Sequence, residues 1–318
     1  MKKFLEKVSQ YGIKESFYRG LHRIAFYLSK IHPYFLFRKY IYGYAIIDVN
    51  NVKMHLDLKN DDGISKELLT LGKREPVTVD FLLDSHLLKE GGMALDIGAN
   101  IGYYALLESK LVGNSGRVYA IEPVSKNLAI LNKNVALNGF SNIETYHLAI
   151  GNEENKEASI YARSKGNLSS FTSIPSDSDE RIVKTEKVRL VTADSFVREN
   201  MKRVPDFIRM DVEGYEFEIL KGMSQMLEIS PSLLIEFHPM ILTDTQKEWI
   251  CELLKKYYSQ VVVTVNPKGK IDRFTRYLNR KMGEELKREG IVEKGNIETL
   301  RKHLFSSNRV FNTFIYNP

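Results

Sequence analysis

The chain has 318 residues, of which 43% are hydrophobic and 27% are charged, and its formal net charge is +6. This composition is typical of a globular protein and excludes a collagen-like, disordered or disulfide-rich chain. A single cysteine, Cys251, excludes an internal disulfide and a metal site built from several cysteines. No apolar run approaches the roughly 20 residues that a membrane-spanning helix needs, and no apolar stretch of a signal peptide follows Met1. We therefore expect a cytoplasmic protein.

The positive charge is concentrated in two segments of the chain. Residues 1–40 carry a net +7 and residues 267–309 a net +6, whereas the remaining residues carry −7. Two basic arms around an acidic middle suit an anionic partner, such as a lipid surface, a phosphorylated carrier or RNA. The alternative is that both arms are ordinary solvated helices.

The N-terminal residues 1–44 are expected to form a basic, aromatic helical arm. Apolar residues recur at helical spacing at Phe17, Leu21, Ile24 and Leu28, which predicts an amphipathic helix over residues 15–30. Such a helix either docks on its own domain or lies on a membrane surface.

Residues 45–91 are expected to form a hairpin and helical cap. Two short strands are predicted within residues 45–58, joined at Asn50 and Asn51, because asparagine tolerates the positive φ that a two-residue hairpin turn requires. Two helices are expected to follow, over 64–71 and 76–89.

From residue 92 to residue 318 strands alternate with helices. The expected strands are 93–97, 117–121, 143–148, 156–161, 186–191, 206–210, 232–237, 261–265 and 310–316, and the expected helices are 102–111, 125–138, 214–227 and 244–258. This alternation predicts an α/β domain with a mainly parallel sheet and helices on both faces. Residues 267–309, between the last two strands, are interpreted as a helical insertion.

The strongest motif is an apolar strand that ends in an acidic residue, Asp96, and runs into a glycine-rich turn. Ligands of open α/β sheets bind at the carboxyl ends of the strands, where this turn lies. Gly98 and Gly102 would let the backbone approach a ligand closely and let the next helix pack on the strand. Glu122, at the end of the following strand, is positioned to accept hydrogen bonds from both ribose hydroxyls of a nucleoside.

Two residues of this motif favour S-adenosylmethionine over a nicotinamide dinucleotide. Asn100 stands where the dinucleotide fingerprint has a glycine that lets the backbone meet a pyrophosphate. Asp96 would bind the ammonium of a methionine moiety, whereas it would repel a pyrophosphate. A purely structural strand-to-helix turn and a nicotinamide dehydrogenase are the alternatives.

Four linked motifs resemble the FkbM family of methyltransferases over about residues 64–240. They are Leu95–Tyr104, Ile121–Pro123, Asp206–Glu216 and Leu234–His238. The resemblance implies the class I methyltransferase (Rossmann-like) fold, with a seven-stranded sheet that contains one antiparallel strand, and S-adenosylmethionine as the cofactor. It also implies O-methylation, often of sugars or natural products. The sequence departs from the family at Arg209, where lysine is common, and a planar guanidinium is not equivalent to a point charge.

The resemblance extends the expected cofactor site beyond the glycine turn. Tyr103 and Pro123 lie inside the matched motifs, and Glu75 corresponds to an acidic residue often found upstream of the turn. Ala149 and Ile150 follow the third strand, where this fold usually lines the adenine. The expected cofactor-binding residues are therefore Glu75, Asp96, Gly98, Asn100, Gly102, Tyr103, Glu122, Pro123, Ala149 and Ile150.

Four polar residues near the ends of the fourth and fifth parallel strands are the candidates for chemistry: Asp211, Glu213, Glu236 and His238. An alcohol loses a proton when it is methylated, so a base or a metal ion helps. We expect Asp211, Glu213 and His238 to be catalytic. Related small-molecule O-methyltransferases place a metal-binding carboxylate at the position that resembles Asp211.

Two arrangements of these residues remain open. Asp211, Glu236 and His238 could hold a divalent cation such as Mg²⁺ or Mn²⁺, or a carboxylate and His238 could form a base pair. The structural alternatives are that Glu213 caps a helix, that Glu236 pairs with Arg209, and that His238 is an ordinary loop residue.

These observations predict an S-adenosylmethionine-dependent O-methyltransferase that acts on a hydroxyl of a sugar, glycan or lipid-linked glycan. The arm at residues 1–44 suggests the lipid-linked substrate and a peripheral membrane contact. The alternatives are an RNA methyltransferase, prompted by the basic arms, and a non-catalytic module that binds the cofactor. Because no RNA-binding module and no Pro-Pro-Tyr or Pro-Pro-Trp motif is present, we do not expect a nucleic-acid partner.

Overall fold

The computed structural model describes the chain except for five segments. The described residues are 43–59, 64–163, 169–170, 182–266 and 290–318. The amphipathic helix expected at 15–30 lies outside them, and the segment 267–309 is described only from residue 290. Within the described residues, no helix is long and apolar enough to span a membrane.

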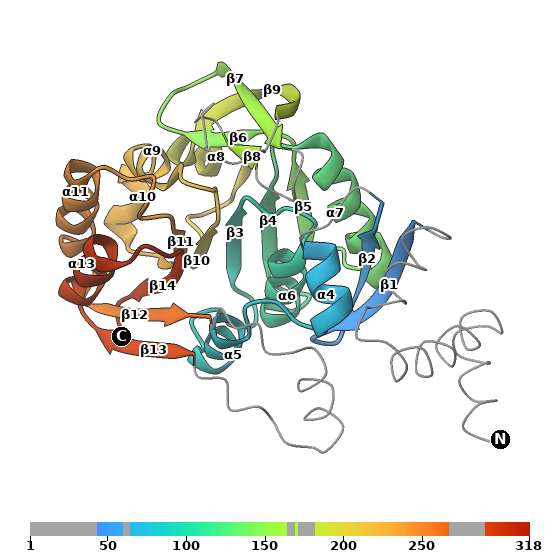
Figure 1. Cartoon of the computed structure of the whole chain (residues 1–318), viewed down its shortest axis with the longest axis horizontal. Coiled ribbons are helices and arrows are strands. Elements are labelled where there is room, and N and C mark those ends of the chain that lie inside the picture. The colour runs from blue at the N-terminus through green and yellow to red at the C-terminus, as the bar shows by residue number, and fades with distance from the viewer. Residues whose placement is uncertain (1–42, 60–63, 164–168, 171–181, 267–289) are drawn as a thin grey trace.

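Eight described strands form the central sheet. They are β3 (Met93–Ile97), β4 (Arg117–Ile121), β5 (Ile143–Tyr146), β10 (Phe207–Met210), β11 (Ser232–Phe237), β12 (Gln260–Val265), β13 (Ile291–Gly295) and β14 (Phe311–Tyr316). Their order is β13-β12-β14-β11-β10-β3-β4-β5 (Figure 1). From β11 to β5 the neighbouring strands are parallel. β14 runs antiparallel to both β11 and β12.

The sheet differs from the prediction at one edge. Seven strands with one antiparallel member were expected, and β13 adds an eighth strand, antiparallel to β12. β13 lies inside the stretch that was interpreted as a helical insertion. The apolar pair Ile291 and Val292 suits a strand, and a helix, α13 (Ile297–Ser306), begins only after Asn296 caps it. The division of the chain into domains stays a prediction.

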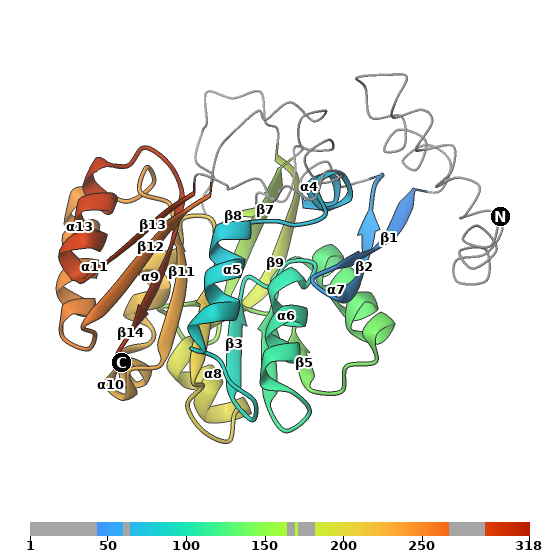
Figure 2. The same cartoon turned by 90° about the horizontal axis from the view of Figure 1, so that it is seen from below.

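Helices cover both faces of this sheet. One face carries α5 (Pro76–Ser85), α6 (Tyr103–Val112) and α7 (Ser125–Asn138), and α4 (Ile64–Leu71) lies beside them against the N-terminal hairpin. The other carries α8 (Ala193–Asn200), α9 (Glu216–Lys221), α10 (Ser224–Ile229), α11 (Asp244–Lys255) and α13. Figure 2 shows α5 and α6 in front of the sheet, where α6 packs on β3 and β4 and α5 packs on β12. The expected doubly covered α/β fold is therefore confirmed.

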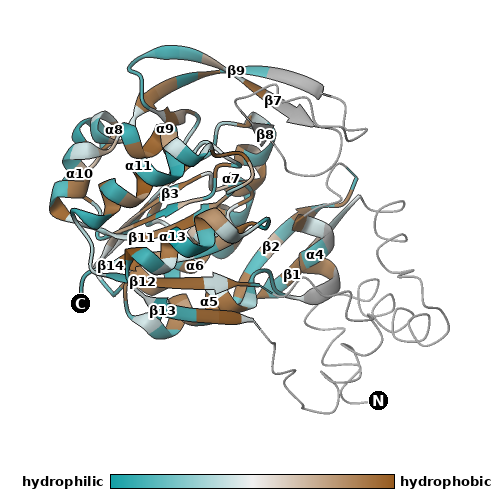
Figure 3. Cartoon of the chain, turned by 60° about the vertical axis from the view of Figure 1, so that its left-hand side comes forward, coloured by the Kyte–Doolittle hydropathy of each residue, from teal (hydrophilic) through white to brown (hydrophobic). Residues whose placement is uncertain are grey.

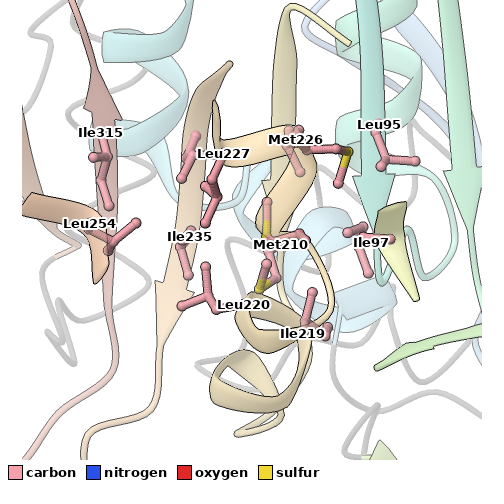
Figure 4. Packing of buried hydrophobic residues seen from close by; sticks show 14 of the residues in the cluster. Leu95, Ile97, Met210, Ile219, Leu220, Met226, Leu227, Ile235, Leu254 and Ile315 are labelled. Carbon is pink, nitrogen blue, oxygen red and sulfur yellow. The ribbon is translucent and has the colours of Figure 1, made fainter. Parts of the chain in front are cut away.

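Alternation along the strands decides which side chains reach which face. Leu95, Ile97 and Met210 pack into the core beneath α9 and α10 (Figure 4). Asp96 and Arg209 lie between these positions, so they point to the opposite face, which α5 and α6 cover. Two charged residues thus enter a mainly apolar layer, next to the glycine turn that follows β3.

One expected helix is broken in two. The prediction placed a single helix over 214–227, whereas α9 ends at Lys221 and α10 begins at Ser224. Gly222 lies between them, and a Cβ atom there would come within 2.0 Å of the carbonyl oxygen of Gly151. Because this close backbone contact fixes the position of Gly222, the chain turns there and starts a second helix.

A second, smaller sheet lies beside the main one. Its strands, in the order β6-β9-β7-β8, are β6 (Ala149–Gly151), β9 (Ile182–Thr192), β7 (Lys156–Arg163) and β8 (Ser169–Ser170). The two strands expected at 156–161 and 186–191 are confirmed as β7 and β9 and are longer than predicted. Figure 3 shows both hydrophobic and hydrophilic colouring along the coloured part of β9, as expected for a strand with one buried side.

The predicted hairpin is confirmed as β1 (Tyr44–Val49) and β2 (Val52–Asp57). Asn50 and Asn51 have φ values of 49° and 60°, which is the left-handed geometry of a two-residue hairpin turn. The hairpin lies beside α4 and α7 (Figure 1).

Asn134 of α7 connects the hairpin to the glycine turn. Its Oδ1 accepts a hydrogen bond from the backbone N–H of His55 at 2.5 Å, and its Nδ2 donates to the carbonyl oxygen of Ile101 at 2.8 Å. A fully buried amide therefore holds the free edge of β2 and the glycine-rich turn at the same time.

We expect Asn134→Ala to lower the free energy of unfolding by about 1–3 kcal/mol, because it leaves buried backbone groups without partners. Urea denaturation measures this loss. Asn132→Ala is the matched control, because Asn132 is exposed on the same helix and its side chain bonds only to Thr145 among the described residues. Equal stability of both variants would contradict the connecting role of Asn134.

Candidate active site

The glycine turn is held tightly against its neighbours. The backbone N–H groups of Gly98 and Ala99 both donate to the carbonyl oxygen of Ile121 at 2.9 Å. Gly98 has a φ of +83°, and a Cβ there would lie 2.0 Å from the carbonyl oxygen of Asp211. Gly98 therefore allows close contact with the chain after β10, in addition to any approach by a ligand.

Gly102 serves helix packing, although its partner differs from the one expected. It has a φ of +93°, and a Cβ there would lie 2.4 Å from the side chain of Leu131 on α7. The sequence predicted that Gly102 packs the helix on the strand, whereas in the structure it brings α6 close to α7.

Glu122 is buried at the carboxyl end of β4 and bonded to the turn. Its Oε2 accepts from the N–H of Asn100 at 2.8 Å, and its Oε1 accepts from the N–H of Val124 and from Asn127. Burial raises the pKa of Glu122 to about 7, although these three hydrogen bonds oppose the rise. A carboxylate offers about four acceptor positions. One position therefore remains for a ribose hydroxyl, fewer than the two that were expected.

Asn100 and Tyr103 are also placed around the turn. Asn100 adopts a left-handed φ of 53°, and its Oδ1 accepts from the N–H of Ile101. The Tyr103 hydroxyl donates to the carbonyl oxygen of Arg74 at 3.0 Å and accepts from Asn50. Tyr103 is thus used to hold the cap on α6, and no feature of its contacts requires a cofactor.

The remaining predicted cofactor residues lie on the other side of β4. Ala149 and Ile150 are buried in β6, and Ala149 packs in a small cluster with Val124. The carbonyl oxygen of Pro123 lies 3.1 Å from Nε2 of His147. These positions place β6 close to the segment Pro123–Val124, and the contact of these residues with a cofactor stays a prediction.

Arg209 forms a buried bridge between two strand ends. Its Nη1 donates to Asp96 Oδ1 at 2.9 Å and its Nη2 donates to Asp211 Oδ2 at 2.8 Å. Its guanidinium also lies 4.0 Å from the ring centre of Tyr104. The second oxygen of Asp96 is buried and has no side-chain partner among the residues that the structure describes. The sequence assigned Asp96 to an ammonium of the cofactor, whereas in the structure Asp96 is paired with Arg209.

Tyr104 links this bridge to Glu75. The Tyr104 hydroxyl donates to Glu75 Oε2 at 2.8 Å, and Glu75 Oε1 lies 2.6 Å from Nε of Arg74. Asn312 of β14 donates to the same Glu75 oxygen at 3.4 Å. Glu75 has a left-handed φ of 45°, an unfavourable conformation for a glutamate that is typically retained at functional sites.

Glu108 of α6 is fully buried near Asp96 and Arg209, and neither of its carboxyl oxygens has a hydrogen-bond partner among the described residues. Burial, and secondly the negative charge of Asp96, raise the pKa of Glu108 well above its ordinary value, although Arg209 opposes the rise. The folded protein therefore keeps this carboxyl protonated at pH values at which the unfolded chain has lost the proton.

We expect Glu108→Gln to be more stable than the unchanged protein at neutral pH. The folded-state pKa is raised, so Glu108 costs stability increasingly as the pH rises above about 4.5, by about 1.4 kcal/mol per pH unit until the folded-state pKa is reached. Denaturant titrations at several pH values measure the difference between the two proteins. A difference that does not grow with pH would contradict a buried, protonated Glu108.

His238 is clamped between two carboxylates. Its Nδ1 lies 2.7 Å from Glu216 Oε1 and its Nε2 lies 3.2 Å from Glu213 Oε2. Burial by itself lowers the pKa of His238, but these two carboxylates raise it to about 11. A histidine with this pKa is already protonated at neutral pH, so the geometry does not suit the base role expected of His238. Glu213 bonds to His238 and does not cap a helix.

The residues expected to bind a metal do not fit a divalent cation. Both ring nitrogens of His238 face carboxylates, and Asp211 Oδ2 is bonded to Arg209. Among the residues that the structure describes, no group of three or more His, Cys, Asp or Glu side chains could hold a metal ion. Asp211, Glu236 and His238 therefore do not form a donor set.

Glu236 is the last of the four candidates for chemistry, and it differs from the other three in having a buried carboxyl oxygen that is not yet used. Its Oε2 is buried and has no hydrogen-bond partner among the described residues. Burial, Asp211 and Glu75 raise the pKa of Glu236 well above its ordinary value, whereas Arg74 and His238 oppose the rise. The ion pair considered between Glu236 and Arg209 is not formed.

The strand order, with β14 antiparallel beside β11 and a glycine turn at the carboxyl end of β3, defines the class I methyltransferase fold. A family model described as "Methyltransferase FkbM domain" matches residues 96–282, which is more than half of the chain. The chain therefore belongs to the FkbM methyltransferase family, as the motifs predicted.

Two curated relatives match parts of the chain. Hexuronic acid methyltransferase AglP from Haloferax volcanii is 24% identical over 159 residues, which cover 47% of this chain and 57% of the relative. Protein-L-isoaspartate O-methyltransferase from Methanococcoides burtonii is 31% identical over 72 residues, which cover 23% of this chain and 36% of the relative. The chain thus spans little more than half of the first relative and about a third of the second.

Solved structures show a more distant likeness. A SAM-dependent O-methyltransferase from Thermotoga maritima matches with a TM-score of 0.40 and 11% identity, covering 86% of this chain and 78% of that protein.

The sequence did not reveal several polar residues of the site. Glu108, Tyr104 and Glu216 were assigned no role, and Arg74 was not considered. One signal was available for Glu108, which is the only acidic residue in the helix Tyr103–Val112. Nothing local indicated that Tyr104 would reach Glu75, because that contact joins residues 29 positions apart.

Proposed function

We propose that this chain transfers the methyl group of S-adenosylmethionine to a hydroxyl of a sugar, glycan or lipid-linked glycan. The observation that carries the proposal is the family match over a glycine turn whose backbone is bonded to the buried carboxylate of Glu122. When bound, S-adenosylmethionine supplies a methyl group on a positively charged sulfur. The chain provides the position and the electrostatic environment for the transfer.

Several features of the site suit that cofactor. Gly98 and Gly102 keep the turn free of side chains, and Glu122 retains one acceptor position for a ribose hydroxyl. Among the described residues, one carboxyl oxygen of Asp96 at the end of β3 and one of Glu236 at the end of β11 lack a hydrogen-bond partner, and such acceptors suit a ligand that donates hydrogen bonds better than an anionic pyrophosphate.

The sugar acceptor is supported by the name of one relative, a hexuronic acid methyltransferase. The lipid-linked form of the substrate is supported by the net positive charge of residues 1–40, which suits an anionic membrane surface. Membrane contact through residues 1–44 therefore remains part of the proposal.

The test is methyl transfer from labelled S-adenosylmethionine to a panel of acceptors. The panel contains methyl glycosides of a hexose, an amino sugar and a hexuronic acid, a lipid-linked glycan, an isoaspartyl peptide and a single-stranded RNA. We expect label in at least one sugar compound, in an alkali-stable ether. Label in the peptide or the RNA alone would contradict the proposal and support a different acceptor class.

A further inference from the structure

The cations at the carboxyl ends of β10 and β11 are already neutralised. Each of the three described there is paired with two carboxylates other than that of Glu236. The pairs are Arg74 with Glu67 (3.5 Å) and Glu75 (2.6 Å), Arg209 with Asp96 (2.9 Å) and Asp211 (2.8 Å), and His238 with Glu213 (3.2 Å) and Glu216 (2.7 Å).

Glu236 stands among these pairs without a cation of its own. Its Oε2 is buried and lacks a hydrogen-bond partner in the described part of the chain. A buried acceptor without a partner costs about 1–3 kcal/mol. Such a group is typically retained where a ligand or a reaction uses it.

Glu236 lies at the same end of the sheet as the glycine turn, with β10 between the two. Gly98 contacts the backbone of Asp211 directly, and β10 and β11 are in register with Met210 beside Ile235. The residues that follow, Asp211 and Glu236, are therefore neighbours at the same sheet edge. A methyl donor bound at the glycine turn and an acceptor alcohol bound at Glu236 would therefore meet at this end of the sheet.

We propose that Glu236 binds the acceptor hydroxyl and takes its proton during methyl transfer. This inference rests on the proposed function and assigns its proton acceptor. The hydroxyl oxygen forms the new O–C bond, the C–S bond of the sulfonium breaks with its electron pair left on sulfur, and the hydroxyl proton moves to Glu236 Oε2. S-adenosylhomocysteine and a protonated Glu236 result.

The surroundings of Glu236 suit this task. The groups that face it are Asp211 after β10, Glu75 before α5, Arg74 beside Glu75, and His238 at the end of its own strand. The two carboxylates make the ionised form of Glu236 a stronger base. His238, already protonated between Glu213 and Glu216, does not compete for the proton.

The experiment compares the full-length protein with Glu236→Gln, which keeps the shape and removes the basicity. The substrate is the methyl glycoside of the acceptor panel that the unchanged protein methylates fastest. We measure kcat from acidic to alkaline pH, and S-adenosylhomocysteine affinity by calorimetry. Glu228→Gln is the matched control, because Glu228 is exposed on α10.

We expect Glu236→Gln to lower kcat by about 100-fold or more and to leave S-adenosylhomocysteine affinity unchanged. The unchanged protein should gain activity as rising pH removes the proton of Glu236, and the variant should lack this rise. Equal kcat and pH profiles would overturn the proposal, and so would a parallel loss of cofactor affinity, which indicates a structural role. An unchanged protein that binds S-adenosylhomocysteine but methylates no glycoside would instead contradict the sugar-directed function.

Discussion

Replacing Arg209 with methionine should lower the free energy of unfolding by about 3–5 kcal/mol, because one partner of a buried ion pair is removed. Arg209 holds Asp96, which is fully buried, and Asp211 at the same time. Without the guanidinium, Asp96 would have to be buried as an uncompensated charge or take up a proton. Urea denaturation at neutral pH measures the loss.

Two further variants make this prediction specific. Arg209→Lys retains a cation but not the fork that reaches two carboxylates, so we expect a smaller loss. Arg198→Met removes an exposed arginine whose nearest carboxylate, that of Glu199, is 3.9 Å away, and it should change stability by no more than about 0.5 kcal/mol. If Arg209→Met and Arg198→Met had the same free energy of unfolding, the structural importance of the bridge would be contradicted.

Replacing Gly98 with alanine should lower the affinity for S-adenosylhomocysteine by about 10- to 100-fold, because moving the turn would cost about 1.5–3 kcal/mol of hydrogen bonding to the ligand. The added Cβ would lie 2.0 Å from the carbonyl oxygen of Asp211, at a φ of +83°. Because the added Cβ atom would meet a backbone carbonyl and not a flexible side chain, the turn itself has to move. Calorimetric titration measures the affinity.

Gly139→Ala is the control for the backbone conformation alone. Gly139 also has a positive φ, +66°, but a Cβ there would meet nothing within 4 Å. This variant should lose about 1–2 kcal/mol of stability and keep its affinity. If Gly98→Ala bound S-adenosylhomocysteine with unchanged affinity, the contact between the turn and Asp211 would not be what positions the cofactor.

The sequence predicted the α/β core well, because the strands and helices of this region have strong local signals. The strand Met93–Ile97 and the helix Ser125–Asn138 match the prediction residue for residue. Where the prediction failed, contacts distant in the sequence decided the outcome. Gly222, where the helix breaks, lies against the backbone of Gly151, and β13 pairs along the edge of β12.

The candidate site could be predicted in part for the same reason. Glycine spacing and strand ends located the turn and Glu122 without the structure. They did not reveal that Arg209 neutralises Asp96, or that His238 lies between two carboxylates. Those pairings depend on which side chains face each other across neighbouring elements. We therefore propose Glu236, and not His238, as the base.

Calorimetric titration of the purified chain with S-adenosylhomocysteine, next to a titration with NAD, tests the central claim most directly. We predict micromolar binding of S-adenosylhomocysteine, strongly weakened by Gly98→Ala, and no binding of NAD. A folded protein that binds NAD, or that binds neither compound, would contradict an S-adenosylmethionine site at the glycine turn.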